Sequence, residues 1–148
     1  MIVTARRLAI ASPKKPRQAD LKRAISAAYY ALFHAMAKDA AELLVGVGPT
    51  KPGKAWSQVY RSLEHTAAKT ACKAVRNLGF PQSINVCADA FVTLQQQRHE
   101  ADYDPDCRVL RVDAIDAIEL AEDAIRNLKT APRRDRKAFA VLLLLRKR

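Results

Sequence analysis

Apolar residues recur at steps of three and four along most of the chain, the spacing that places them on one face of an α-helix. The first such stretch follows Pro13 and Pro16, starts at Asp20 as a plausible N-cap and ends near Gly46. Its apolar positions are Ile25, Tyr29, Leu32, Met36, Ala40 and Leu43. This pattern predicts one long amphipathic helix, which a loop rich in glycine and proline follows at residues 46–53.

Two more long helices are expected in the middle of the chain. Apolar residues continue at helical spacing over residues 54–78, which predicts a second long helix with a break near Cys72. A third helix begins at Ser83. It should end within residues 101–105, because Pro105 disfavours helical geometry at the residue before it.

A fourth helix is expected after Pro105, and a short final one after Pro132. The fourth helix should direct most of its acidic residues toward solvent. Its apolar residues should face the core, and they are Val112, Ile115, Ile118, Ile125 and Leu128. The final helix contains an apolar run at 138–145 without a polar face, so it should pack in the bundle or against another subunit. Since no strand-like alternation occurs, we predict an all-α, up-and-down bundle of four to five helices.

The composition favours a single globular domain. With 148 residues, 49% of them apolar and only 4 glycines, the chain can fold around its own core. We divide it into a basic N-terminal arm at 1–19, a helical bundle at 20–130 and a basic and apolar C-terminal helix at 131–148. The longest apolar run has eight residues, far fewer than the roughly 20 that cross a bilayer, so we expect no membrane contact.

The cysteines and loops give no sign of a metal or cofactor. Cys72, Cys87 and Cys107 are odd in number and isolated, which favours the reducing cytoplasm as the location. No pair of histidines has the spacing of metal ligands, and the segment at 46–54 lacks the spacing of a phosphate-binding loop. We therefore expect neither a metal nor a cofactor.

The positive charge is concentrated at the two ends of the chain. The formal net charge is +11, and residues 1–23 and 131–148 each hold seven basic side chains and one acidic one. The ends could form one positive patch that attracts phosphate-rich ligands, because domain termini are often close in space. Alternatively, these side chains solvate the chain ends or pair with the acidic stretch at 100–123.

An arginine interrupts the apolar stripe of the third helix. Four apolar residues lead at steps of three and four toward Arg98, where the pattern calls for another apolar residue. Burying an arginine is costly unless the guanidinium is paired or hydrogen-bonded. Its partner could be Asp102 at the i+4 position, an acid from another helix, or a ligand phosphate.

Two other polar lines run along the first and second helices. The first line consists of Arg23, Ser26, Tyr30 and His34. The second consists of Ser57, Arg61 and His65. A lone histidine near an apolar face is more often a satisfied core residue than a catalytic one. The value of these lines therefore depends on whether folding brings His34, Arg61, His65 and Arg98 into one cleft.

Two of these segments resemble a known superfamily. Residues 23–35, RAISAAYYALFHA, and residues 94–104, LQQQRHEADYD, are similar to motifs of small bacterial HEPN (higher eukaryotes and prokaryotes nucleotide-binding) domains. The resemblance implies a bundle of four to five helices that forms a homodimer. It also implies a setting in toxin–antitoxin or defence systems, with an antitoxin-type protein as a partner.

The resemblance also implies a catalytic chemistry, from which this chain departs. Catalytic members are metal-independent ribonucleases with an arginine that stabilises phosphate and a later histidine that assists proton transfer. Arg98 matches the arginine, and His99 matches the polar residue that often follows it. The positions open to the histidine hold Tyr103, Asp104 and Pro105, and a tyrosine is a poor base at neutral pH.

Three hypotheses follow for the function. The first is a module that binds RNA or a nucleotide through Arg98, with Tyr30, His34, Arg61, His65 and Asp102 as ligand-binding candidates. The second is an RNA endonuclease toxin, with Arg98, His99 and Tyr103 as candidate catalytic residues and a substitute histidine. The third is a structural or interaction protein, in which Arg98, Asp102 and Tyr103 only fix the bundle.

Overall fold

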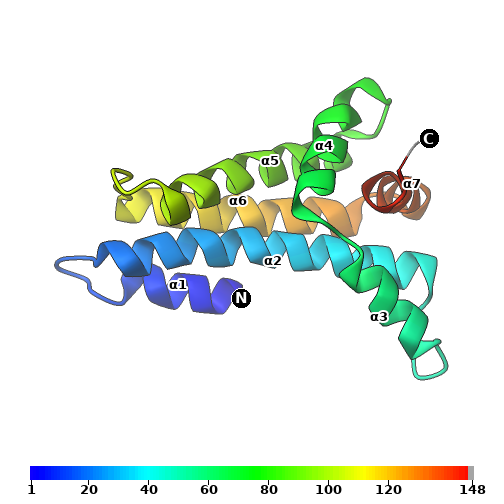
Figure 1. Cartoon of the computed structure of the whole chain (residues 1–148), viewed down its shortest axis with the longest axis horizontal. Helices are drawn as coiled ribbons and strands as arrows, with labels where there is room; N and C mark the ends of the chain where they lie inside the picture. The colour runs from blue at the N-terminus through cyan, green and yellow to red at the C-terminus, as the bar shows by residue number, and fades with distance from the viewer. Residues whose placement is uncertain (147–148) are drawn as a thin grey trace.

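In the computed structural model, which describes residues 1–146, the chain is helical and contains no strand within that range (Figure 1). Its α-helices are α1 (Ile2–Ile10), α2 (Gln18–Leu44), α3 (Gly53–Arg61), α4 (His65–Ala74), α5 (Gln82–Tyr103), α6 (Arg111–Thr130) and α7 (Arg133–Leu144). A single 3-10 turn, η1 (Val75–Asn77), follows α4.

Four of these helices form the body of the molecule. Figure 1 shows α1, α2, α5 and α6 aligned along the long axis, and α2 contacts each of the other three. At one end of this body α3 and α4 diverge, with α3 packed on α2 and α4 packed on α5. Helix α7 contacts α2 and α4 at the same end. No helix in this part of the chain has the length and apolar composition needed to span a bilayer.

The apolar stripes of α2 and α5 form the centre of the core, as their spacing predicts. All six apolar positions predicted for α2 are buried, and so are Ile84, Cys87, Phe91 and Leu94 of α5. Many of the other buried residues of α2 and α6 are alanines, among them Ala24, Ala28, Ala117 and Ala121. Such small side chains allow two helices to approach closely along their length, and α2 and α6 are in extensive contact.

The second long helix expected from the sequence is divided into two helices. The break lies at residues 62–64, whereas Cys72, near which a break was expected, is buried inside α4. Leu63 is buried at the break, so it contributes to the core although its backbone is not helical. The break allows α3 to pack on α2 while α4 turns toward α5, and it contributes to a count of seven α-helices in residues 1–146 instead of four to five.

Both basic ends of the chain contain helices that pack on the bundle. Within residues 1–19, α1 buries Ala5 and Ala9, and α1 contacts both α2 and α6. At the other end α7 buries Phe139, Ala140 and Leu143 and leaves Val141 exposed, and Leu145, just beyond its end, is exposed too. The last two residues of the tail lie outside the described range.

The basic side chains of these ends pair with acids on different helices. Arg6 of α1 forms an ion pair with Glu122 of α6, within the acidic stretch, at 2.7 Å. Arg136 of α7 pairs with Asp39 of α2, at 2.6 Å. Part of the terminal positive charge is therefore neutralised by carboxylates of the bundle.

Candidate functional site

Arg98 lies near the end of α5, one helical step beyond its apolar stripe, and its side chain is only 15% exposed. Three tyrosine rings surround the guanidinium group. Its central carbon lies 5.3 Å from the ring centre of Tyr29, 5.4 Å from that of Tyr30 and 5.9 Å from that of Tyr103. A cation near the faces of aromatic rings is attracted by their quadrupoles, so the rings stabilise a charge that has lost most of its water.

The polar contacts of Arg98 leave part of its hydrogen-bonding capacity unused. Nη2 donates a hydrogen bond to the Tyr30 hydroxyl at 3.2 Å. Nε lies 3.4 Å from an Asp102 carboxylate oxygen, an ion pair that lacks the geometry of a hydrogen bond, and this buried N–H has no other acceptor. The other Asp102 oxygen accepts a hydrogen bond from Ser26 of α2 at 2.8 Å. Asp102, which the sequence analysis named as a possible i+4 partner of Arg98, thus forms an ion pair with it.

His65, the first residue of α4, lies beside these tyrosines. Its Nδ1 shares a hydrogen bond with the Tyr29 hydroxyl, and its ring stacks on Phe33 with 4.2 Å between ring centres. Gln95 fixes the backbone here by donating to the His65 carbonyl at 3.0 Å. Burial lowers the pKa of His65, and the positive charges of Arg98 and His34 lower it further. Burial also raises the pKa of Tyr29 to about 12, so both groups are neutral near pH 7.

His34 lies on the other side of Tyr30. Its ring stacks on Tyr30 with 6.2 Å between centres, and its Nδ1 shares a 2.7 Å hydrogen bond with the Tyr60 hydroxyl of α3. Tyr30 therefore touches both His34 and Arg98, which come from different helices. We call the group of Tyr29, Tyr30, His34, His65, Arg98, Asp102 and Tyr103 the Arg98 cluster.

The structure brings together most of the residues singled out in the sequence. Six of the ligand-binding and catalytic candidates belong to the cluster, whose residues lie on α2, α4 and α5. They are Tyr30, His34, His65, Arg98, Asp102 and Tyr103. His99 is exposed at its edge, with its ring 4.9 Å from that of Tyr103. Arg61 is exposed on α3 beside Lys54 and Ser57, and no hydrogen bond or ion pair joins it to the cluster in the described part of the chain.

Two residues of this region were not singled out as functional. Tyr29 is one of the apolar positions predicted for α2, and Tyr60 lies in the stretch of apolar helical spacing at 54–78, so the spacing favoured a core role for both. Tyr29 is indeed buried, yet its hydroxyl contacts a histidine, and Tyr60 binds the second histidine. The only sequence signal was the hydroxyl itself, because a buried tyrosine usually needs a polar partner.

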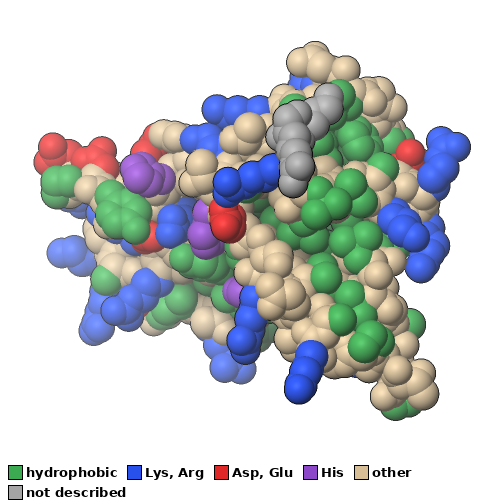
Figure 2. Space-filling model, turned by 45° about the vertical axis from the view of Figure 1, so that its right-hand side comes forward, with side chains coloured by type: hydrophobic (Ala, Val, Ile, Leu, Met, Phe, Trp, Pro, Cys, Tyr) green, Lys and Arg blue, Asp and Glu red, His purple; other side chains and the backbone are tan. Residues whose placement is uncertain are grey.

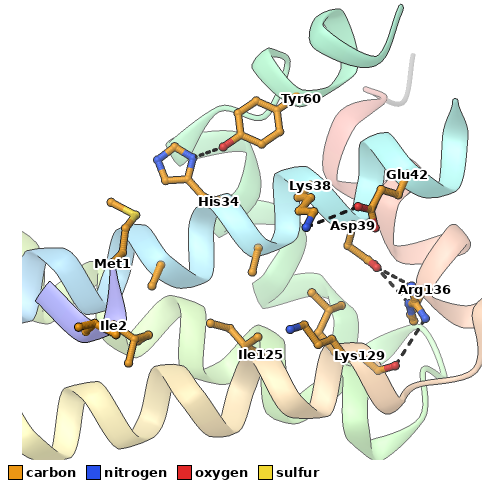
Figure 3. Close-up of a pocket in the computed structure, with 14 residues that line it drawn as sticks. Met1, Ile2, His34, Lys38, Asp39, Glu42, Tyr60, Ile125, Lys129 and Arg136 are labelled. Atoms are coloured by element: carbon orange, nitrogen blue, oxygen red, sulfur yellow. Dashed lines mark hydrogen bonds and ion pairs between the residues drawn. The ribbon is translucent and has the colours of Figure 1, made fainter. Parts of the chain in front are cut away.

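A groove of about 690 Å³ adjoins the Arg98 cluster at His34 (Figure 3). It runs between α2 and α6, and α1, α3 and α7 supply further lining residues. His34 and Tyr60 line it, as do the charged residues Lys38, Asp39, Glu42, Lys129 and Arg136. Arg98 does not line this groove. The cluster and the groove thus share His34 but are different surfaces.

Figure 2 shows histidine side chains on one face of the molecule, with both basic and acidic groups beside them. Within residues 1–146, no three His, Cys, Asp or Glu side chains are grouped so that they could hold a metal ion. This face offers the guanidinium group of Arg98, the neutral His65 imidazole and Tyr29 phenol, and the carboxylate of Asp102.

The lowered pKa of His65 predicts a pH dependence of stability. In the unfolded chain a histidine takes up its proton near pH 6.5, whereas folded His65 resists protonation at that pH. The unfolded state then binds more protons, so the free energy of unfolding should fall as the pH drops from about 7.5 to about 5.5. Urea denaturation at both pH values measures this slope. His65→Gln should reduce this pH dependence, and the exposed control His99→Gln should not. Equal slopes in the wild type and both variants would contradict a lowered pKa of His65.

Comparison with known protein families, with curated proteins and with solved structures gives no significant match.

Proposed function

We propose that the chain is a HEPN-like module that binds RNA or a nucleotide through the Arg98 cluster. The observation that supports this proposal most directly is the surrounding of one guanidinium group by three tyrosine rings and a single paired carboxylate, with His65 near enough for the charge of Arg98 to lower its pKa. One carboxylate, itself 33% exposed, balances the charge of Arg98 only in part, because water screens an exposed acid. A phosphate group could complete that balance.

Tyr103 offers a surface for a base. Its side chain is 65% exposed although its ring lies near Arg98 and His99, so much of the ring faces solvent. Bases of single-stranded RNA stack on aromatic rings and on guanidinium planes, and each such stack contributes roughly 1–3 kcal/mol. A base on Tyr103 would bring its phosphate close to Arg98.

Basic side chains continue from the cluster along α2. Arg23 is exposed one turn before Ser26, which holds Asp102. Further exposed cations precede it at Lys14, Lys15 and Arg17, for which no ion pair occurs in residues 1–146. Such a row of cations suits a phosphate backbone, whose binding weakens steeply as salt increases.

Fluorescence anisotropy with a labelled single-stranded RNA tests this proposal. We expect salt-sensitive binding that Tyr103→Ala weakens by about tenfold, and that Arg98→Ala weakens by at least as much. Arg134→Ala, which removes one equally positive but 93% exposed side chain on α7, should change the affinity little. Tyr103→Ala keeps the test valid even if Arg98→Ala unfolds, because Tyr103 is exposed. Equal affinity of the wild type and Tyr103→Ala, or no RNA binding at low salt, would refute the proposal.

A second candidate, an RNA endonuclease, is favoured by the neutral imidazole of His65 beside Arg98. As the RNA 2′-hydroxyl attacked the adjacent phosphorus, His65 would accept its proton and Arg98 would stabilise the charged phosphate. The departing 5′-oxygen would take a proton from solvent water, and His65 would later release its own proton to solvent. The Tyr29 hydroxyl occupies Nδ1, so only Nε2 of His65 is available for this role. Growth of a bacterial host that expresses the wild type, His65→Gln or Arg98→Ala tests it. Arrest by the wild type alone supports catalysis, and equal growth of all three speaks against it.

A further inference from the structure

We propose that the groove between α2 and α6 binds a small apolar molecule that carries one carboxylate group. This inference does not rest on RNA binding, because the groove lies beyond His34 and does not include Arg98. It rests on the shape of the groove, its apolar lining and the arrangement of its charges.

The groove exists because two helices leave a stretch of the α2–α6 seam uncovered. Helix α1 packs along α2 and α6 and lines the groove only with its first residues. Helix α7 packs on α2 and lines it with Arg136. Between them the seam is open, as Figure 3 shows, and its volume of about 690 Å³ lies within the range of small-molecule sites.

The walls of the groove suit an apolar body. Half of its lining residues are apolar, and they come from α2, α6 and the start of α1. On α2 the residues at the centre are Ala31 and Ala35, whose small side chains leave the space open. The apolar residues of the lining are Met1, Ile2, Val3, Ala31, Ala35, Ile125 and Leu128. Displacing water from such a surface favours binding of hydrocarbon in proportion to the area buried.

Among the charged side chains that line the groove, one cation has no carboxylate partner within residues 1–146. Asp39 and Arg136 neutralise each other at 2.6 Å, and Lys38 pairs with Glu42 at 3.7 Å. Lys129 also lines the groove, and no carboxylate of residues 1–146 forms an ion pair with it. In Figure 3 its side chain extends from α6 into the space between α6 and α2. A ligand with a single negative charge would provide the missing ion-pair partner of Lys129.

The order of residues along the two helices sets the direction of the ligand. On α2 the apolar positions Ala31 and Ala35 precede the charged positions, and on α6 Ile125 precedes Lys129. Helices α2 and α6 run in the same direction in Figure 1, so the apolar half of the groove lies toward α1 and the charged half toward α7. The carboxylate would therefore lie near Lys129, and the hydrocarbon would extend toward α1.

Isothermal titration calorimetry with octanoate, 1-octanol and acetate separates the two parts of this interaction. The wild type should bind one octanoate, bind 1-octanol more weakly and show no saturable binding of acetate. Lys129→Glu should weaken octanoate on the order of tenfold while 1-octanol keeps its affinity, since only the charge interaction is reversed. Lys137→Glu, the same charge change at an exposed α7 position that does not line the groove, should leave both affinities unchanged.

A second variant tests the location of the hydrocarbon. Ala35→Leu fills the groove and should remove binding of octanoate and 1-octanol, whereas Ala19→Leu, on the exposed start of α2, should not. Circular dichroism verifies that both variants are folded. The proposal is overturned if octanoate shows no saturable binding, or if folded Ala35→Leu and Lys129→Glu bind it like the wild type. If octanoate does not bind and Ala35→Leu converts a dimer into monomers, the proposal is overturned in favour of a second copy of the chain as the occupant of the groove.

Discussion

Replacement of Tyr29 by alanine should lower the free energy of unfolding by about 4 kcal/mol, the scale of aromatic truncations in a core. Tyr29 is fully buried in the middle of α2, and its ring contacts Phe33 and Phe91. The change would open a cavity at the centre of the bundle. It would also remove the hydroxyl that binds His65 and one of the rings around Arg98, so two polar groups would lose a partner.

Urea denaturation at pH 7.5 measures the effect of Tyr29→Ala. The matched control is Tyr103→Ala, which removes the same side chain from the rim of the same cluster, where it is exposed; it should cost no more than about 1 kcal/mol. Tyr29→Phe should fall between the two, because it keeps the ring and loses only the hydroxyl. Similar losses in Tyr29→Ala and Tyr103→Ala would show that Tyr29 is not central to the core.

The second large effect is expected at α7. Phe139 is buried and packs edge-on against Phe80, with 6.2 Å between ring centres, so it anchors α7 to the segment that precedes α5. Phe139→Ala should lower the free energy of unfolding by about 3–4 kcal/mol, because the bundle cannot refill the space of a ring.

Thermal unfolding followed by circular dichroism reports this loss as a lower midpoint. Val141→Ala is the control on the same helix: Val141 is 38% exposed, so its truncation should shift the midpoint only slightly. If Phe139→Ala unfolded at the wild-type temperature, α7 would contribute little to the stability of the bundle.

Periodicity predicted the core stripes of α2 and α5, whereas Val112 of α6, which was expected to face inward, is exposed. The stripes of α2 and α5 are buried as expected, and Pro105 lies just beyond the end of α5 at Tyr103. The break at 62–64 could not be predicted, because no glycine or proline marks it and the apolar spacing continues through Leu63. The helical state of α1 was missed for a similar reason, since its small buried residues, Ala5 and Ala9, form a weak apolar pattern.

The candidate site was predictable within each helix and not between helices. The i+4 spacing of Arg98 and Asp102 indicates their ion pair directly. The meeting of His34 and His65 around Tyr30 depends on the angle at which α4 leaves α3, and no local pattern encodes that angle. Arg61 follows the same spacing as His65 yet lies outside the cluster, because the break in the helix separates their faces.

The last turn of α5 holds two of the groups that enclose Arg98. Asp102 and Tyr103 both belong to it, and Ser26 reaches that turn from α2 through Asp102. Unwinding a single turn would therefore release the ion pair, remove one ring from the guanidinium group and free Ser26 in one step. Fraying of this helix end would therefore expose Arg98, and a ligand that replaces these contacts would gain by holding that end open.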